Sequence, residues 1–268
     1  MIERPILFSS PMVRAILDGT KTQTRRAIRI DDSPILTSKP GVYQRGIPRN
    51  AQNVRMCASY LKCDAPAGSA AVSSRVPCPY GFVDERLWVR ETWASAVGVD
   101  SKAPVDFIHQ GWPIWYAVDD SVAYPGASNG GPSFMTRGKT RVSIHMPREA
   151  SRITLEINEV RVQRLQQISG EDARAEGVQY PVSTKDCPPG TCKPLFALGD
   201  GTIDRAIEWG IYSRPGQRAE REPTHDDMSR LYFAQLWDSI NGKRPGCSWR
   251  DNPWLWCISF KRVEQSHA

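Results

Sequence analysis

The sequence lacks any long hydrophobic run. No apolar stretch approaches the roughly 18 consecutive residues that a helix needs to cross a bilayer. The N-terminal segment MIERPILFSS also lacks the apolar centre of a secretory signal peptide, because Glu3 and Arg4 place charges near its start. We therefore expect a cytoplasmic protein that has no membrane partner.

Runs of like charge, internal repeats and low-complexity tracts are missing as well. The formal net charge is +6 and the pI is about 9.0, with the arginines scattered along the chain. A basic surface permits an anionic partner such as RNA or a nucleotide, but it does not define an activity. The 268 residues, of which 40% are hydrophobic, are enough to bury a sizeable core.

The seven cysteines lack the close C-x-x-C spacing that is typical of zinc sites. An odd number of cysteines in a cytosolic chain favours free thiols over disulfides, and we expect no metal. The spacing leaves open one alternative, a zinc ion shared by two loops. Its candidate ligands are Cys57, Cys63, Cys78, Cys187 and Cys192.

The periodicity of the apolar residues predicts short strands that alternate with short helices. Strands are expected at residues 85–93, 113–118, 151–165 and 252–263, and helices at residues 9–19, 168–178 and 225–242. Ser10 and Ser169 are the expected caps of the first two helices, and Gly19 and Gly177 are expected to end them. The expected buried side of the last helix consists of Met228, Leu231, Tyr232, Leu236 and Ile240.

Two long segments, residues 31–82 and 180–225, are rich in turn-forming residues and have no clear periodicity. We interpret them as insertions with little regular structure. The remaining elements predict an α+β fold, in which residues 1–268 form one domain built on a small mixed β-barrel.

The segment GTKTQTRR, residues 19–26, places Lys21 and Thr24 three residues apart just after the first helix. A lysine acts as a base only when it is neutral, and burial beside Arg25 and Arg26 would lower its pKa. A threonine hydroxyl acts as a nucleophile when a base lies beside it. The alternative interpretation is a solvated polar turn.

Glu176 falls in the last turn of the helix at residues 168–178, where the helix dipole disfavours a negative charge. If this carboxyl is also buried, it would suit proton transfer; the alternative is an ordinary surface glutamate. His145 could contact a phosphate or a base edge, and Trp88 could stack on a base. A structural histidine and a core tryptophan are the alternatives for these two residues.

Four segments together resemble the ASCH-domain family of the PUA-like superfamily, in particular its larger members from phage and prophage genomes: ILDGTKTQTRR, DERLWVRETW, VRVQRLQQISGEDARAEGV and NPWLWCISFKRV. The resemblance covers about half of the chain and skips both insertions. It implies a small β-barrel with short helices at its mouth. Arg26 matches the arginine of the family motif, whereas Arg25 stands where the family can have a hydrophobic residue.

The resemblance implies two functions. Some small ASCH proteins are amidohydrolases that deacylate N4-acetylcytidine with a lysine, a threonine and a glutamate, which correspond here to Lys21, Thr24 and Glu176. Other members of the superfamily bind RNA, or modified bases in DNA, without chemistry.

We therefore expect hydrolysis of an N4-acylated cytosine nucleoside or base, with Arg25, Arg26, His145 and Trp88 as substrate contacts. Neutral Lys21 would take a proton from Thr24 or from water, so an acyl-threonine and a directly activated water both remain open. Arg26 or a backbone amide would stabilise the oxyanion, and no cofactor is needed. A non-catalytic module that binds RNA, DNA or a modified base is the alternative, and the sequence does not indicate the oligomeric state.

Overall fold

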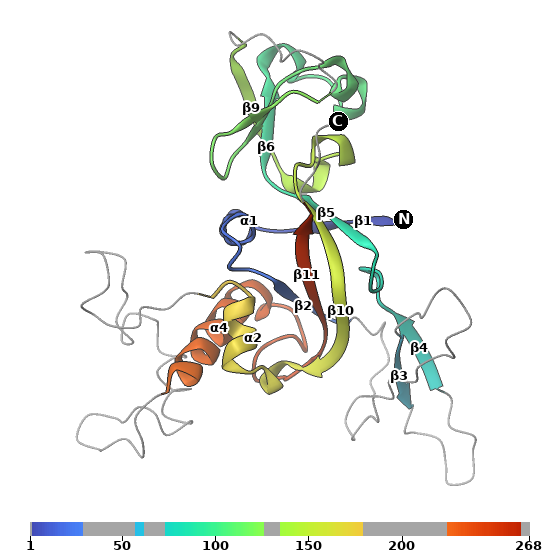
Figure 1. Cartoon of the computed structure of the whole chain (residues 1–268), viewed down its shortest axis with the longest axis vertical. Helices are drawn as coiled ribbons and strands as arrows, with labels where there is room; N and C mark the ends of the chain where they lie inside the picture. Colours follow the sequence, from blue (N-terminus) through green and yellow to red (C-terminus); the bar gives the residue numbers. More distant parts are fainter. Residues whose placement is uncertain (1, 29–56, 62–72, 126–134, 179–223, 264–268) are drawn as a thin grey trace, which may run out of the picture. The chain divides into compact units, whose positions relative to one another are not determined.

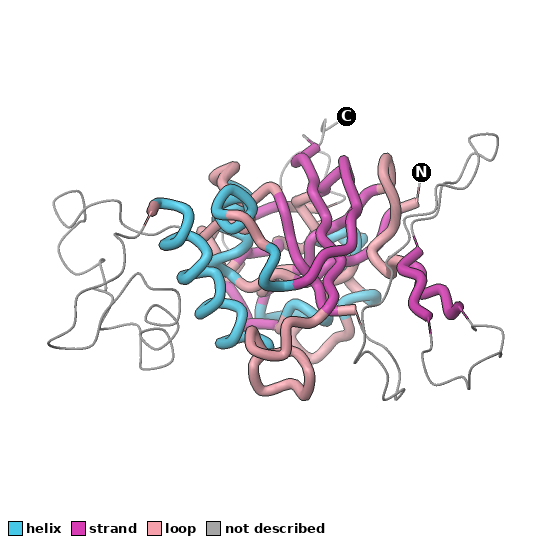
Figure 2. Tube along the Cα trace, turned by 90° about the horizontal axis from the view of Figure 1, so that it is seen from below, coloured by secondary structure: helices cyan, strands magenta, loops and turns pink. Residues whose placement is uncertain are grey.

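The computed structural model of the chain describes residues 2–28, 57–61, 73–125, 135–178 and 224–263 (Figure 1). The α-helices are α1 (Ser10–Leu17), α2 (Gly170–Ala175) and α4 (His225–Asn241). The strands are β1 (Glu3–Leu7), β2 (Gln23–Ala27), β3 (Cys57–Leu61), β4 (Ser73–Pro77), β5 (Arg86–Arg90), β6 (Trp93–Ala96), β7 (Ile114–Tyr116), β8 (Val122–Ala123), β9 (Arg137–Arg141), β10 (Thr154–Arg164) and β11 (Trp254–Val263). The predicted mixed α+β class is confirmed (Figure 2).

The strands form a five-stranded sheet of order β1-β5-β10-β11-β2, a four-stranded sheet of order β8-β7-β6-β9 and the pair β3-β4. β1 runs parallel to β5, and β10 runs antiparallel to β5. Within the described residues none of these sheets closes into a barrel, so the barrel stays a prediction. No helix in the described part of the chain has the length and apolarity required to span a bilayer.

The chain divides into two compact units. Unit 1 comprises Met1–Gly19, Ile35–Val160 and Ile258–Ala268, and unit 2 comprises Thr20–Pro34 and Arg161–Cys257. The long strands β10 and β11 each have residues in both units. The expectation of a single domain stays a prediction.

In unit 1, one apolar core surrounds β6 and β7. It is made of Trp93, Val99, Phe107, Ile108, Ile114, Tyr116, Met146 and Ala150. Helix α1 buries Val13 and Ile16 and ends at Gly19, whose φ of +74° fits the left-handed conformation that glycine favours there. Its N-cap is Ser9 and not the expected Ser10, because Ser9 is the last extended residue and Pro11 then occupies the first turn.

In unit 2, α2 and α4 lie side by side and share an apolar core with the neighbouring strand residues (Figure 1). The core contains Leu165, Ile168, Ala173, Val178, Phe233, Ala234, Trp237, Trp249, Leu255 and Cys257. The predicted buried side of α4 is wrong in part, since Leu236 and Ile240 are 37% and 46% exposed. The aromatic rings of Phe233 and Trp237 bury more apolar area, and they set which side of α4 faces the core.

The expected insertion at residues 31–82 contains more regular structure than predicted. β3 pairs antiparallel with β4, with Cys57 opposite Pro77 and Leu61 opposite Ser73. This segment carries no hairpin signal, because residues 62–72 separate the two strands and a recognisable hairpin has a turn of only a few residues. The remainder of this segment up to residue 72, and residues 180–223 of the second, lie outside the described residues.

Candidate functional site

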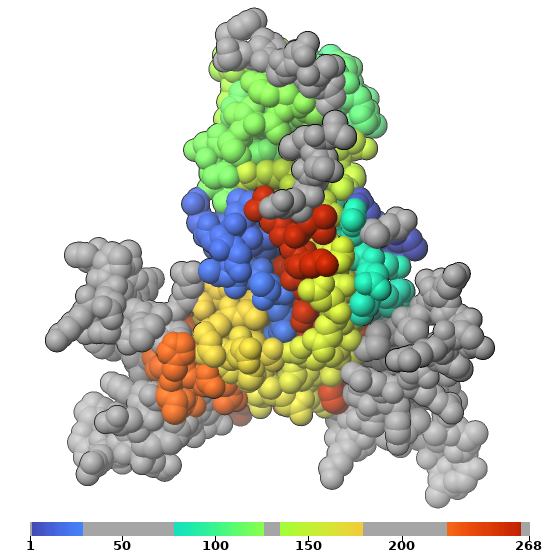
Figure 3. All heavy atoms as spheres, viewed as in Figure 1, coloured from blue at the N-terminus to red at the C-terminus, as the bar shows by residue number. Residues whose placement is uncertain are grey.

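The entry to β2 lies against the end of α2. Lys21 forms an antiparallel backbone bridge with Glu176, and the amide of Thr22 donates to the carbonyl of Ala175 at 2.8 Å. In the space-filling view, blue residues of the N-terminal segment pack against yellow residues of α2 (Figure 3). Two segments far apart in the sequence are thus held together through their backbones.

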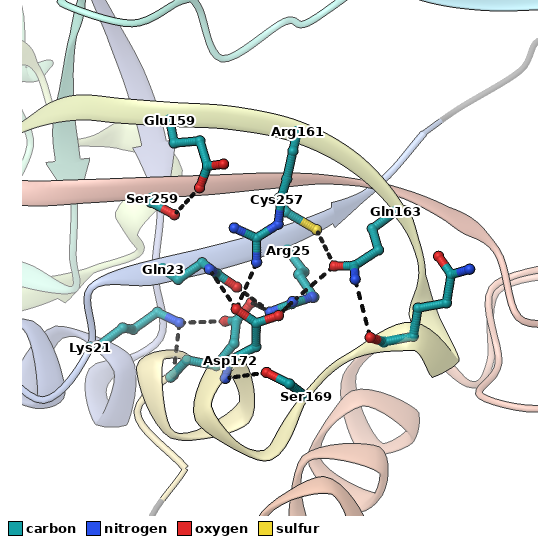
Figure 4. Close-up of polar contacts among 12 residues, drawn as sticks. Lys21, Gln23, Arg25, Glu159, Arg161, Gln163, Ser169, Asp172, Cys257 and Ser259 are labelled. Carbon is teal, nitrogen blue, oxygen red and sulfur yellow. Dashed lines mark hydrogen bonds and ion pairs between the residues drawn. The ribbon is translucent and has the colours of Figure 1, made fainter. Parts of the chain in front are cut away.

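In residues 21–25, every second side chain faces α2. Lys21, Gln23 and Arg25 all contact residues of α2 or its C-cap (Figure 4). Successive side chains of an extended chain point to opposite sides, so Thr24 and Arg26 belong to the other face of β2. Thr24 is buried there and Arg26 is half-buried.

The Lys21 ammonium and the Glu176 carboxylate form a buried pair. Lys21 Nζ donates to Glu176 Oε2 at 2.6 Å and to the Glu176 backbone carbonyl at 2.8 Å. The side chains are 0% and 6% exposed. Glu176 is the C-cap residue of α2. As the sequence predicts, Ser169 caps the start of this helix, and Gly177 follows Glu176 in the left-handed conformation. A cation that binds the last carbonyl of a helix is also favoured by the helix dipole.

Burial lowers the pKa of Lys21 below its ordinary value of 10.5. The negative charge of Glu176 opposes this effect, whereas the positive charges of Arg26 and Arg25 add to it. A neutral lysine amine keeps two N–H donors for the two bonds to Glu176, and its lone pair can take a proton. The pair can therefore hold Lys21 as a base without losing its hydrogen bonds.

Asp172 connects β2, β10 and α2 through its carboxylate. Oδ2 accepts from Arg25 Nη2 at 2.8 Å, and Oδ1 accepts from Arg161 Nη2 at 2.6 Å and from Gln23 Nε2 at 3.1 Å (Figure 4). The amide of Asp172 donates to Ser169 Oγ, so the residue also completes the predicted helix cap. Asp172 was not singled out from the sequence for its contacts with β2, because the sequence carries no local signal for them.

Burial alone would raise the pKa of Asp172, but the charges and hydrogen bonds of Arg25, Arg161 and Gln23 lower it below the ordinary 3.8. The stability that this carboxylate contributes is fully present above about pH 3.8. It is lost as the pH falls through the lower pKa of Asp172 in the folded protein. Asp172→Asn is expected to cost about 2 kcal/mol at pH 7 and less near pH 3. Urea unfolding at both pH values tests this, and an equal cost at both would contradict it.

The other predicted substrate contacts lie in unit 1. Trp88 is 7% exposed in β5, with the Arg90 guanidinium 4.7 Å from the centre of its ring. His145 is exposed in the 3-10 turn Ser143–His145. The structure thus groups Lys21, Arg25 and Glu176 in unit 2, while the roles of Trp88 and His145 stay predictions.

Some of the cysteines lie outside the described residues. Cys63, Cys187 and Cys192 fall there, and Cys57 lies in β3. Cys78 is a buried free thiol whose pKa burial raises to about 11. The described residues contain no cluster of three or more side chains suited to hold a metal ion. The zinc alternative stays untested.

A surface hollow of about 370 Å³ lies between the end of α2 and one side of α4. It is lined by Gly177, Val178, Tyr232, Gln235, Leu236 and Ser239. Its volume is in the range of small-molecule sites, and its first lining residue directly follows Glu176 in the chain.

Comparisons of the chain with models of known protein families, with curated proteins and with solved structures found no match. A function for this site has to be argued from its side chains and their contacts.

Proposed function

We propose that this chain is an amidohydrolase that cleaves the N4-acyl amide of N4-acylated cytosine nucleosides or bases. The products are cytidine or cytosine and a carboxylic acid. The observation that carries the proposal is the buried Lys21–Glu176 pair, in which an amine with a lowered pKa donates to a carboxylate at 2.6 Å. The resemblance to ASCH-domain amidohydrolases supplies the substrate class, and the closed barrel belongs to the same proposal.

A buried amine next to a carboxylate can move one proton through an amide hydrolysis. Neutral Lys21 removes a proton from water, and the oxygen attacks the acyl carbonyl. Lys21 then passes this proton along the 2.6 Å bond to Glu176, which delivers it to the amide nitrogen as the C–N bond breaks. The water oxygen and its second hydrogen remain on the acid, and the leaving amine has gained one proton.

Glu176 has one oxygen available to hold the amide of the substrate. Oε2 accepts from Lys21, whereas Oε1 is buried and accepts no hydrogen bond from the described residues. A buried carboxylate oxygen without a hydrogen bond is uncommon, and the N–H of an exocyclic amide is a donor that would satisfy it.

The face of β2 on which Thr24 lies favours activated water over an acyl-threonine. Lys21, Gln23 and Arg25 face α2, so backbone alternation turns the Thr24 hydroxyl to the other side of the strand. We propose the direct attack of water, with Thr24 as a buried structural residue of β2.

The test is incubation of the purified protein with N4-acetylcytidine in the presence and absence of hydroxylamine. We expect cytidine and acetate, little acetohydroxamate, and retained activity in Thr24→Val, because water is the nucleophile. Hydroxamate formation together with an inactive Thr24→Val would establish the acyl-threonine route instead. If the protein forms no cytidine but binds oligonucleotides with a steep salt dependence, it is a binding module and not this enzyme.

A further inference from the structure

The arginine at position 25, which the family resemblance does not explain, is part of the buried site. Its side chain is 1% exposed. Nη2 pairs with Asp172 Oδ2 at 2.8 Å, and Nη1 donates to Gln23 Oε1 and lies 3.6 Å from Glu176 Oε1. The guanidinium also lies 5.9 Å from the centre of the Phe233 ring. Arg25 is therefore a fixed cation beside the oxygen of Glu176 that Lys21 does not contact.

We propose that Arg25 is a positioning residue that remains the counter-charge of Glu176 while Lys21 is neutral. In an isolated buried Lys–Glu pair, loss of the lysine proton leaves a buried carboxylate without a cation, which is costly. The described contacts place a second cation, Arg25, beside Glu176. A guanidinium does not release its proton in proteins, so the proton that leaves comes from Lys21.

Asp172 and Gln23 keep Arg25 in this place. Asp172 binds Nη2 and Gln23 binds Nη1, which leaves Nη1 within ion-pair distance of Glu176 but without a hydrogen bond to it. The charge of Arg25 thus acts on Glu176, while Oε1 remains open to a donor from the substrate. The catalytic part of this inference rests on the proposed function, because the charge of Arg25 explains how Lys21 can serve as a base in that reaction.

The charged groups that act on Lys21 belong to two segments. Glu176 is the C-cap residue of α2, and Arg25 and Arg26 lie in β2. Burial and both arginines lower the pKa of Lys21, and Glu176 raises it. Arg161 pairs with the same Asp172 at 2.6 Å, so it offers a matched control for the loss of one cation from this cluster.

The experiment is an NMR titration of the lysine 13Cε signals in the full-length protein without substrate, with the Lys21 signal assigned by its loss in Lys21→Met. Arg25→Met is expected to raise the proton affinity of Lys21 about tenfold. Arg161→Met is expected to leave it within about twofold of wild type, because the ion pair described for Arg161 is with Asp172, whereas Arg25 pairs with both Asp172 and Glu176. Equal effects of the two variants, or no effect of Arg25→Met, would overturn the inference.

Arg25→Lys covers the case in which Arg25→Met does not fold. It keeps a cation beside Glu176, so we expect the proton affinity of Lys21 to stay within about threefold of wild type. A tenfold rise in this variant would sink the inference. Because the titration needs no substrate, a protein without hydrolase activity but with the expected titration would refute the proposed function and leave the role of Arg25 standing.

Discussion

Lys21→Met is expected to lower kcat for N4-acetylcytidine hydrolysis about 1,000-fold, the usual contribution of a positioned general base. Methionine has a similar length and fits an apolar environment, but it has no lone pair able to take a proton from water. In the wild type, activity should rise with pH as Lys21 loses its proton and level off below pH 10.5, the ordinary lysine pKa. Steady-state kinetics between pH 6 and 10 measure both effects.

Two lysine variants separate the base from the ion pair. Lys21→Arg keeps a cation beside Glu176 but cannot release its proton, so it should be as inactive as Lys21→Met. Lys261 forms a pair of the same 2.6 Å length with Glu156, but its side chain is 60% exposed, and Lys261→Met should retain full activity. Wild-type kcat in Lys21→Arg would show that only a positive charge is needed, and the base assignment would be wrong.

The helix cap is the structural alternative that these kinetics test. Lys21 donates to the backbone carbonyl of Glu176, an interaction that stabilises a helix end in many proteins without any chemistry. A cap alone requires neither a buried carboxylate at 2.6 Å nor a second cation at 3.6 Å from that carboxylate. Because burying ionised groups is costly, keeping three of them together argues for a role beyond ending a six-residue helix.

The helix that carries Glu176 could be predicted closely from the sequence, because its signals are local. Ser169 and Gly177 flank it, and Glu176 falls at its C-terminal end as expected. The burial of Glu176 could not be predicted, since its partner Lys21 lies 155 positions away in the chain. Helix signals act over a few residues, whereas burial is decided by whichever segment packs against the helix.

Arg25 and Thr24 show the same limit at the level of a single strand. The three-residue spacing predicts that a loop after the first helix presents Lys21 and Thr24 to the same cavity. The chain is extended here, so the side chains alternate and Lys21 shares a face with Gln23 and Arg25. A loop and an extended strand give Lys21 different neighbours, and the local sequence does not decide between these two backbone conformations.

Replacing Glu176 by alanine should lower the free energy of unfolding by about 3–5 kcal/mol at pH 7, because it leaves the Lys21 and Arg25 cations buried without their shared carboxylate. Arg25 keeps Asp172, but Lys21 must either remain charged in an apolar environment or lose its proton. Loss of the Glu176 charge lowers the pKa of Lys21 further below 10.5, so the variant gains more stability than the wild type as the pH rises toward that value. The cost of Glu176→Ala should therefore shrink between pH 7 and 10.

Urea unfolding followed by circular dichroism measures this cost, with Glu171→Ala as the matched control. Glu171 is exposed in the first turn of the same helix, and its removal should cost less than about 1 kcal/mol. Glu176→Gln keeps an oxygen that can accept from Lys21 and removes only the charge, so its cost should fall between the two. If Glu176→Ala costs no more than Glu171→Ala, the buried pair contributes nothing to folding, and the electrostatic basis for a lysine base at this position is lost.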